Sequence, residues 1–247
     1  MPSSTQNRVG EADAGLPSRA PTASWAPPAP SLAERRIPTG PKAGSVRGHT
    51  LTNGPERRRL AFESNGEAKT AHVLLARPDV VDLREQAEPV SYVDALGYPR
   101  KHYFDFVATL ATGERVAIAY RPHVKARRQG LDGTLRLIAA QMGRQVADRV
   151  VHMSELDLPR DLVHDAKLLH AVRRDDRPED DRKLAAIAAT LQGVTTVGDL
   201  VRASGLAGRG FRAVVRLIGD GTLDIVGPRG IGYATQVVRG AKRAGGQ

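Results

Sequence analysis

Two residues of opposite charge stand beside strongly apolar segments of the chain. Asp105 lies between two phenylalanines, and Arg121 directly follows the alternating, β-rich segment 116–120. A buried carboxylate needs a hydrogen-bond donor or an opposite charge nearby, so an ion pair is the simplest chemistry for this couple. A loop at 112–114 would place Asp105 directly opposite Arg121 across a hairpin, whereas a two-residue loop would place Tyr120 there. In the first register, Arg121 neutralises Asp105 and leaves little charge for a metal ion.

Three arginines near the C-terminal end of the chain follow helical spacing. Arg209, Arg212 and Arg216 recur at i, i+3 and i+7, which places three guanidinium groups on one exposed face of a helix. Arg229 lies in a later turn, and the opposite helix face carries Phe211, Val214, Val215 and Ile218. Such a basic face suits the phosphates of duplex DNA. A solvated face on a unit that binds another protein is the alternative.

Strand and helix signals surround Asp105 and predict one α/β domain over residues 57–176. Ser64-Asn-Gly-Glu67 fits a capping box that starts a helix ending near Leu75. Alternating or β-rich segments predict strands, and apolar residues three or four apart predict helices. The expected strands cover 80–83 (or a turn there), 89–93, 102–110, 116–121 and 146–153, and the further helices cover 134–142 and 162–172.

A second unit is expected over residues 177–240, after the charged and proline-bearing segment 175–182. Three helical segments come first, and the last of them carries the arginine stripe. Two short β-rich segments then follow, joined by the turn Gly227-Pro-Arg-Gly230. Three helices followed by a β-hairpin is the plan of a winged-helix domain. Residues 241–247 form a short basic tail.

The N-terminal part of the chain has a different composition. Residues 1–56 hold nine of the sixteen prolines and few large apolar side chains. Such a segment cannot bury enough apolar surface to offset the entropy of ordering. We therefore expect a disordered tail over residues 1–56.

Composition also narrows the classes of function. The chain carries 37 Lys and Arg against 27 Asp and Glu, a net charge of +10, which favours an anionic partner such as nucleic acid. Within the basic segment 98–130, Lys125, Arg127 and Arg128 are further candidate DNA contacts. The absence of cysteine excludes disulfides and thiolate metal sites. With no long apolar segment and no phosphate-binding glycine loop, we expect no membrane partner, no small-molecule cofactor and a cytoplasmic, nucleoid-associated location.

Several short segments together resemble the TnsA-type transposon endonucleases. They are Asp82-Leu-Arg-Glu-Gln86, Pro89-Val-Ser-Tyr92, Phe104-Asp-Phe106, Val116-Ala-Ile-Ala-Tyr-Arg-Pro122 and Arg149-Val-Val-His-Met-Ser-Glu155. The resemblance covers about residues 59–175, and that family also has two domains. It implies a restriction-endonuclease-like core of the PD-(D/E)xK superfamily, in which carboxylates hold Mg²⁺ at the scissile phosphate. It also implies a transposase or ATPase partner.

The resemblance assigns site residues position by position. The helix glutamate of that family falls on Glu67 and the strand aspartate on Asp105, which would make these two the metal ligands and catalytic carboxylates. The Glu or Gln position falls on Ala119, and the lysine position falls on Arg121. Capping alone also explains Glu67, and ion pairing alone also explains Asp105.

Two departures from the family pattern leave two functions open. Ala119 has no side-chain oxygen for a metal, and Arg121 lacks the compact ammonium group of lysine. One interpretation is a double-stranded DNA-binding protein whose catalysis is impaired, with Glu67, Asp105 and Arg121 as remnants of the catalytic site. The other is an active Mg²⁺-dependent DNA endonuclease of a transposition or mobile-element system, since two carboxylates with water can hold Mg²⁺.

Overall fold

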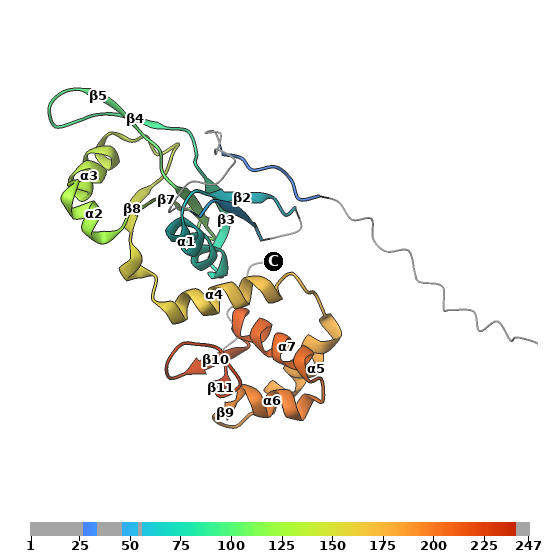
Figure 1. The fold of residues 1–247 in the computed structure, drawn as a ribbon. Helices are drawn as coiled ribbons and strands as arrows, with labels where there is room; N and C mark the ends of the chain where they lie inside the picture. Colours follow the sequence, from blue (N-terminus) through green and yellow to red (C-terminus); the bar gives the residue numbers. More distant parts are fainter. Residues whose placement is uncertain (1–26, 34–45, 54–55, 241–247) are drawn as a thin grey trace, which may run out of the picture.

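The computed structural model describes residues 27–33, 46–53 and 56–240 (Figure 1). Within these ranges the chain forms seven α-helices and four small sheets in a mixed α/β arrangement. Most of the expected N-terminal tail and the basic tail 241–247 lie outside the described residues. The expectation of disorder over 1–56 is wrong for strand β1 (Gly48–Leu51), which pairs antiparallel with β2 (Arg59–Phe62).

The central sheet has the strand order β3-β6-β7-β8. β3 pairs antiparallel with β6, and β6 with β7, whereas β7 and β8 are parallel. Helices α1 and α4 pack against each other over one face, and α3 covers the other face (Figure 1). The bounds are β3 Val80–Glu85, β6 Phe106–Leu110, β7 Arg115–Tyr120, β8 Arg149–Met153, α1 Asn65–Ala76, α3 Leu131–Gln141 and α4 Arg160–Val172.

Strand β7 is central because both of its faces are apolar. Val116 and Ile118 pack in the cluster that includes the buried side of α1. Ala117 and Ala119 point the other way, into the cluster that includes Ile138 of α3. All four β7 side chains are at most 6% exposed, as expected for a strand covered on both sides.

The turn between β6 and β7 sets the register around Asp105. The loop is 111–113: the Leu110 N–H donates to the Glu114 carbonyl, the Gly113 N–H donates to the Leu110 carbonyl, and Gly113 has a φ of 85° that favours glycine. Phe106 therefore pairs with Ile118, and continuing this register places Asp105 beside Ala119. Both expected registers, opposite Arg121 or opposite Tyr120, are wrong.

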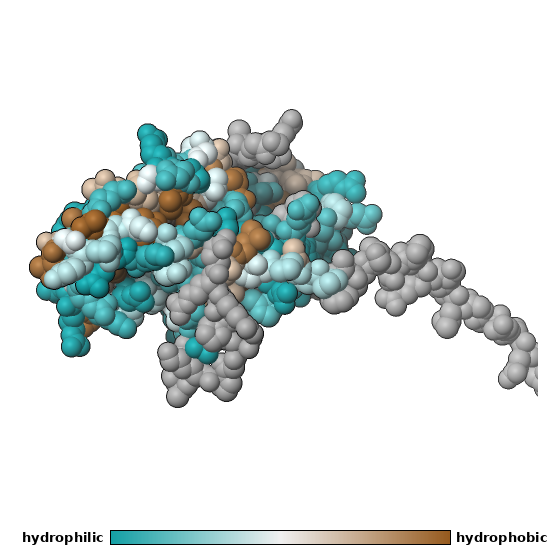
Figure 2. Space-filling model, turned by 90° about the horizontal axis from the view of Figure 1, so that it is seen from above, coloured by the Kyte–Doolittle hydropathy of each residue, from teal (hydrophilic) through white to brown (hydrophobic). Residues whose placement is uncertain are grey.

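The expected single strand 102–110 is divided in two. β5 (Pro99–His102) pairs with β4 (Val90–Val93) in a separate hairpin that extends past α3 (Figure 1). The side-chain amide of Gln141 accepts from the backbone N–H of Val93 and donates to its carbonyl, at 2.8 and 3.0 Å, so it holds the hairpin to α3. The surface seen from above is largely hydrophilic, with hydrophobic residues exposed toward the end that carries this hairpin (Figure 2).

The C-terminal unit contains three helices and a three-stranded antiparallel sheet of order β10-β11-β9. The expected three helices and hairpin are present, and the short strand β9 was not anticipated. A single apolar cluster joins all three helices to β10 and β11. The bounds are α5 Pro178–Ala189, β9 Thr195–Thr196, α6 Val197–Ser204, α7 Gly208–Gly219, β10 Leu223–Val226 and β11 Gln236–Arg239.

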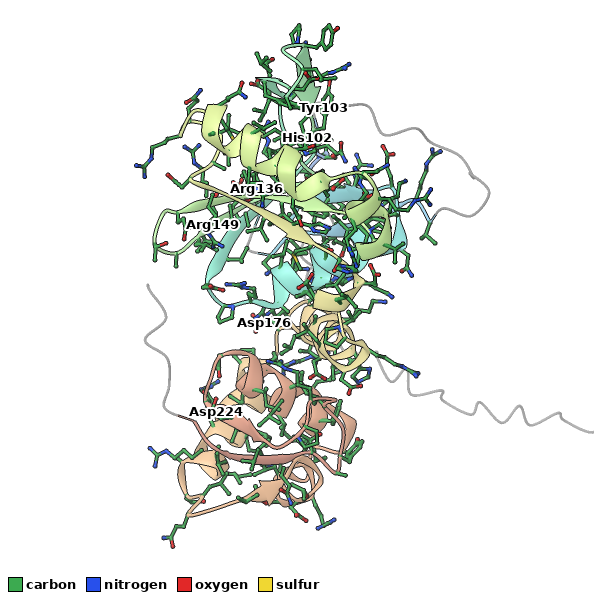
Figure 3. The ribbon with its side chains drawn as sticks, turned by 90° about the vertical axis from the view of Figure 1, so that its left-hand side faces the viewer. His102, Tyr103, Arg136, Arg149, Asp176 and Asp224 are labelled. Carbon is green, nitrogen blue, oxygen red and sulfur yellow. The ribbon has the colours of Figure 1, made fainter. Side chains whose placement is uncertain are left out.

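Helix α4 joins the two parts of the molecule (Figure 3). One side of α4 packs against α1, and its other side packs against α7 in a cluster with Val172, Val215 and Ile231. The buried carboxylate of Asp165 on α4 accepts from the backbone N–H groups of Gly230 and Ile231, at 3.2 and 2.6 Å. These contacts join the two parts, and beside them lies a hollow of about 680 Å³ lined by residues of α1, α4, α7 and β10.

Candidate functional site

Asp105 lies immediately before β6, next to the end of β7. Asp105 is only 9% exposed, and its Oδ2 accepts a hydrogen bond from the backbone N–H of Tyr120 at 2.7 Å. The single backbone donor leaves the remaining lone pairs of the carboxylate for other groups. Asp105 is thus held inside the fold by strand β7.

Burial and, after it, the nearby carboxylate of Glu67 together raise the pKa of Asp105 to about 7. The Tyr120 N–H and the Arg121 guanidinium act in the opposite direction. Asp105 is hydrogen-bonded to the Tyr120 N–H, and Gly66 of α1 packs against the Tyr120 ring, so Asp105, Glu67 and Arg121 lie in one region around Tyr120. A carboxyl with a pKa near neutrality is frequent at functional sites.

Of the two roles that the sequence left open for Glu67, the structure shows the capping role. Its carboxylate accepts from the Ser64 hydroxyl at 2.9 Å and from the backbone N–H of Glu63 at 2.7 Å, so it caps helix α1. A Cβ at Gly66 would overlap the ring of Tyr120. Glycine thus allows the first turn of α1 to approach β7 and places Glu67 near Asp105.

Ala119 and Arg121 differ in their surroundings. Ala119 is 1% exposed in the apolar cluster next to α3. The backbone of Arg121 is fixed by its N–H to the carbonyl of Met153 and by a hydrogen bond between its carbonyl and His152 Nε2, both at 2.9 Å. The pKa of His102 is lowered mainly by burial of its ring and, to a smaller extent, by the guanidinium of Arg121. The cation therefore acts on both Asp105 and His102.

The oxygen donors at this site suit a hard cation such as Mg²⁺, which accepts carboxylate and amide oxygens together with water. The described part of the chain holds no group of three or more His, Asp or Glu arranged for a metal. Glu67 and Asp105 would therefore need a third donor of another type. Gln86 follows β3, its backbone N–H donates to the Asp105 carbonyl, and its buried amide oxygen has no hydrogen-bond partner among the described residues. A bound cation would polarise a phosphate at this position.

A basic helix follows β7 directly. Helix α2 (His123–Arg128) carries Lys125, Arg127 and Arg128, all three exposed. In residues 56–240 no ion pair involves these three side chains. A surface hollow of about 310 Å³ is lined by His123, Val124, Arg127 and Arg128. These cations are therefore available to an anionic partner.

The three arginines of α7 form ion pairs with acidic residues of segment 175–182. Arg216 forms a two-pronged ion pair with Asp181, with N–O distances of 2.6 to 2.9 Å, and its side chain is only 11% exposed. Arg212 pairs with Asp175 at 2.7 Å. The expectation of a fully exposed basic face is therefore wrong.

The segment 175–182, taken as a simple domain break, packs along α7 and supplies these acids. Arg209 also lies 3.5 Å from Asp180 but is 60% exposed. Arg229, on the exposed loop between β10 and β11, has no ion pair within the described ranges. Of the C-terminal candidates, Arg229 and, in part, Arg209 and Arg212 face solvent.

Sequence reasoning did not single out Gln86, whose buried amide oxygen lacks a hydrogen-bond partner in the described part of the chain, although it lies inside one of the segments that carried the resemblance. Its backbone contact with Asp105 depends on strand pairing, which spacing alone does not reveal.

No protein-family description matches the chain, and no curated protein is significantly similar to it. No helix of the described residues has both the length and the apolar character needed to cross a lipid bilayer.

Proposed function

We propose that the protein binds double-stranded DNA through a TnsA-like nuclease core whose cleavage activity is impaired. The observation that carries this proposal is that Glu67, Asp105 and Arg121 lie around Tyr120, with the cations of α2 following in the chain and free of ion pairs within the described residues. A carboxylate site beside a free basic surface suits a phosphate backbone better than an apolar or acidic partner.

Two features of the architecture support this assignment. A mixed sheet with a helix-borne glutamate and a strand-end aspartate at one place agrees with a restriction-endonuclease-like core. Three helices with a three-stranded antiparallel sheet agree with a winged-helix unit. Fold resemblance alone does not determine function, so the site residues carry the argument.

Impaired cleavage follows from the surroundings of Ala119 and Arg121. Ala119 lies among apolar side chains and offers no oxygen to a metal. Arg121 keeps a positive charge near Asp105 but has a broad, planar guanidinium in place of a compact ammonium group. These two changes affect metal binding and charge stabilisation in the transition state, whereas DNA binding through α2 remains.

The proposal is tested by measuring duplex binding over a range of salt concentrations. Replacing Lys125, Arg127 and Arg128 with alanine should weaken binding and reduce the slope of log K against log salt by about 2 to 3, since each phosphate contact contributes about 0.9. The matched control removes three other arginines, Arg202, Arg209 and Arg212, and should change the slope less. Undetectable or salt-independent binding by the wild type would exclude the proposal.

The second candidate function is a Mg²⁺-dependent DNA endonuclease. It is favoured by the convergence of two carboxylates, Glu67 and Asp105. A nicking assay on supercoiled DNA with Mg²⁺ or Mn²⁺ distinguishes the two functions. Products formed by the wild type but not by Asp105→Ala would establish cleavage, and equal products from both proteins would end the enzyme hypothesis.

The resemblance also implies a transposase or ATPase partner, for which the C-terminal unit is the docking candidate. The variant Arg212→Glu removes an ion pair with Asp175 and reverses a half-exposed charge. If the unit docks a partner, this variant should weaken capture of the partner while duplex affinity stays unchanged.

A further inference from the structure

The hairpin of β4 and β5 presents an ordered apolar tip to solvent. The carboxylate of Asp94 accepts from the backbone N–H groups of Leu96 and Tyr98, at 2.9 and 3.0 Å. Gly97 closes the turn with a φ of 85°. Leu96 is 79% exposed and Tyr98 is 57% exposed. Because the backbone of the loop is already fixed, less entropy is lost when these side chains contact a partner.

The strand register gives the hairpin one covered face and one open face. Val90 and Tyr92 pack in the apolar cluster that includes α3, and they alternate along β4 with Ser91 and Val93. Lys101 pairs with Ser91, so its side chain projects from the open face. This side chain is exposed and forms no ion pair within the ranges that the structure describes. The open face therefore carries apolar surface together with an unpaired cation.

The hairpin belongs to a basic end of the molecule. One apolar cluster joins β4 to α2 and α3, so these three elements hold fixed positions relative to one another. Figure 3 shows Arg136 of α3 at the end that carries the hairpin. Residues 90–103 and 123–141 together hold six Lys and Arg against two Asp. Of these six cations, only Arg100 forms an ion pair among the described residues, with Asp94 at 2.9 Å.

The charge of this end decides between the partners that an apolar tip could contact. A second copy of the chain would bring the same cations against each other, and like charges disfavour such an interface. Duplex DNA matches both the charge and the shape. The major groove of B-DNA, about 12 Å wide, admits a two-stranded β-ribbon between two rows of phosphates. Inside that groove, an apolar side chain can contact the C5-methyl group of thymine.

We propose that the β4–β5 hairpin enters the major groove of duplex DNA and places Leu96 against thymine methyl groups, while Lys101 and Arg136 contact the flanking phosphates. The inference rests on the proposed function for its partner, the DNA duplex, and adds base readout to the backbone contacts of α2. Phosphate contacts position a protein on DNA, whereas contacts inside the groove depend on the bases. The hairpin therefore gives the protein a preference for sites with thymine in the major groove.

The contact is tested by combining a change in the protein with a change in the DNA. The affinity of the full chain is measured by fluorescence anisotropy for a short A·T-rich duplex and for the same duplex with deoxyuridine, which lacks the C5-methyl group, in place of thymine. The wild type should lose about fourfold in affinity for each methyl contact removed. Leu96→Ser should bind the thymine duplex about tenfold more weakly than the wild type. This variant should bind the two duplexes equally, because the side chain that reads the methyl group is gone.

Val194→Ser is the matched control, since Val194 is 56% exposed in the C-terminal unit. It should distinguish the two duplexes as the wild type does. Lys101→Ala should reduce the slope of log K against log salt by about 0.9, whereas Leu96→Ser should leave this slope unchanged because it removes no charge. All three side chains are exposed, so denaturant unfolding of the variants should match that of the wild type.

Equal affinity of Leu96→Ser and the wild type for the thymine duplex, or the same loss on deoxyuridine substitution in both proteins, would overturn the inference. Binding to phosphatidylserine vesicles that Leu96→Ser abolishes, with duplex affinity unchanged, would overturn it in favour of a membrane surface. The proposed function fails separately. It fails if removal of the α2 cations changes neither duplex affinity nor the salt slope while the effect of Leu96→Ser persists.

Discussion

Replacing Asp105 with asparagine should stabilise the protein at neutral and alkaline pH. The folded protein holds the pKa of Asp105 at about 7, against an ordinary value of 3.8, mainly because the carboxyl is buried and lies near Glu67. Asparagine keeps an oxygen that can accept from the Tyr120 N–H, and it cannot ionise. The variant therefore removes the cost of a buried charge and keeps the hydrogen bond.

The magnitude follows from proton linkage. A carboxyl with a raised folded-state pKa contributes stability that is fully present below about pH 3.8 and is lost as the pH rises through about 7. The difference between about 7 and 3.8, at 1.36 kcal/mol per pH unit, gives an upper limit of about 4 kcal/mol. The stability difference between Asp105→Asn and wild type should therefore grow between these two pH values and then level off.

The assay is denaturant unfolding of both proteins at a series of pH values in EDTA, with the difference in unfolding free energy as the readout. Asp94→Asn is the control, because hydrogen bonds with the backbone N–H of Tyr98 and with Arg100 lower the pKa of Asp94. Its effect should have the opposite sign at neutral pH. A pH-independent difference for Asp105→Asn, or a destabilisation that grows with pH, would refute the reasoning.

Three further predictions concern the side chains of His170 and Arg216 and the close approach of Gly66 to Tyr120. Burial and neighbouring cations lower the pKa of His170 to about 4, so stability should fall as the pH drops from 6.5 to about 4. His170→Gln should flatten this dependence in acid-unfolding curves. Arg216→Ala should cost about 2–3 kcal/mol by leaving Asp181 unpaired, with unchanged duplex affinity, and a double-mutant cycle with Asp181→Ala measures the coupling. Gly66→Ala should destabilise by about 1–3 kcal/mol through overlap with Tyr120, and a smaller residue at position 120 should restore stability in thermal unfolding.

Much of the local structure could be predicted from the sequence, because short-range patterns determine it. Ser64 and Glu67 form the cap that starts α1, and the alternating segment before Arg121 is strand β7. Helix capping and alternation depend on residues a few positions apart, and they act before distant contacts form. The same is true of the three helices and hairpin of the C-terminal unit.

The strand register could not be predicted because it depends on the conformation of one turn. The positive φ of Gly113 closes a loop one residue earlier than the expected loop at 112–114, and this shift changes the neighbour of Asp105 from Arg121 to Ala119. A change in register alters every cross-strand neighbour, while the sequence pattern stays the same.

The charges show the same division between sequence and tertiary structure. By itself the sequence determined that Arg209, Arg212 and Arg216 share one helix face. Only the tertiary structure decided that acids of segment 175–182 pair with this face, whereas the cations of α2 have no ion pair within the part of the chain that the structure describes. Ion pairs between distant segments depend on how helices pack, which spacing within one helix does not encode. For the same reason, the backbone contact of Gln86 with Asp105 emerged only when β3 and β6 were paired.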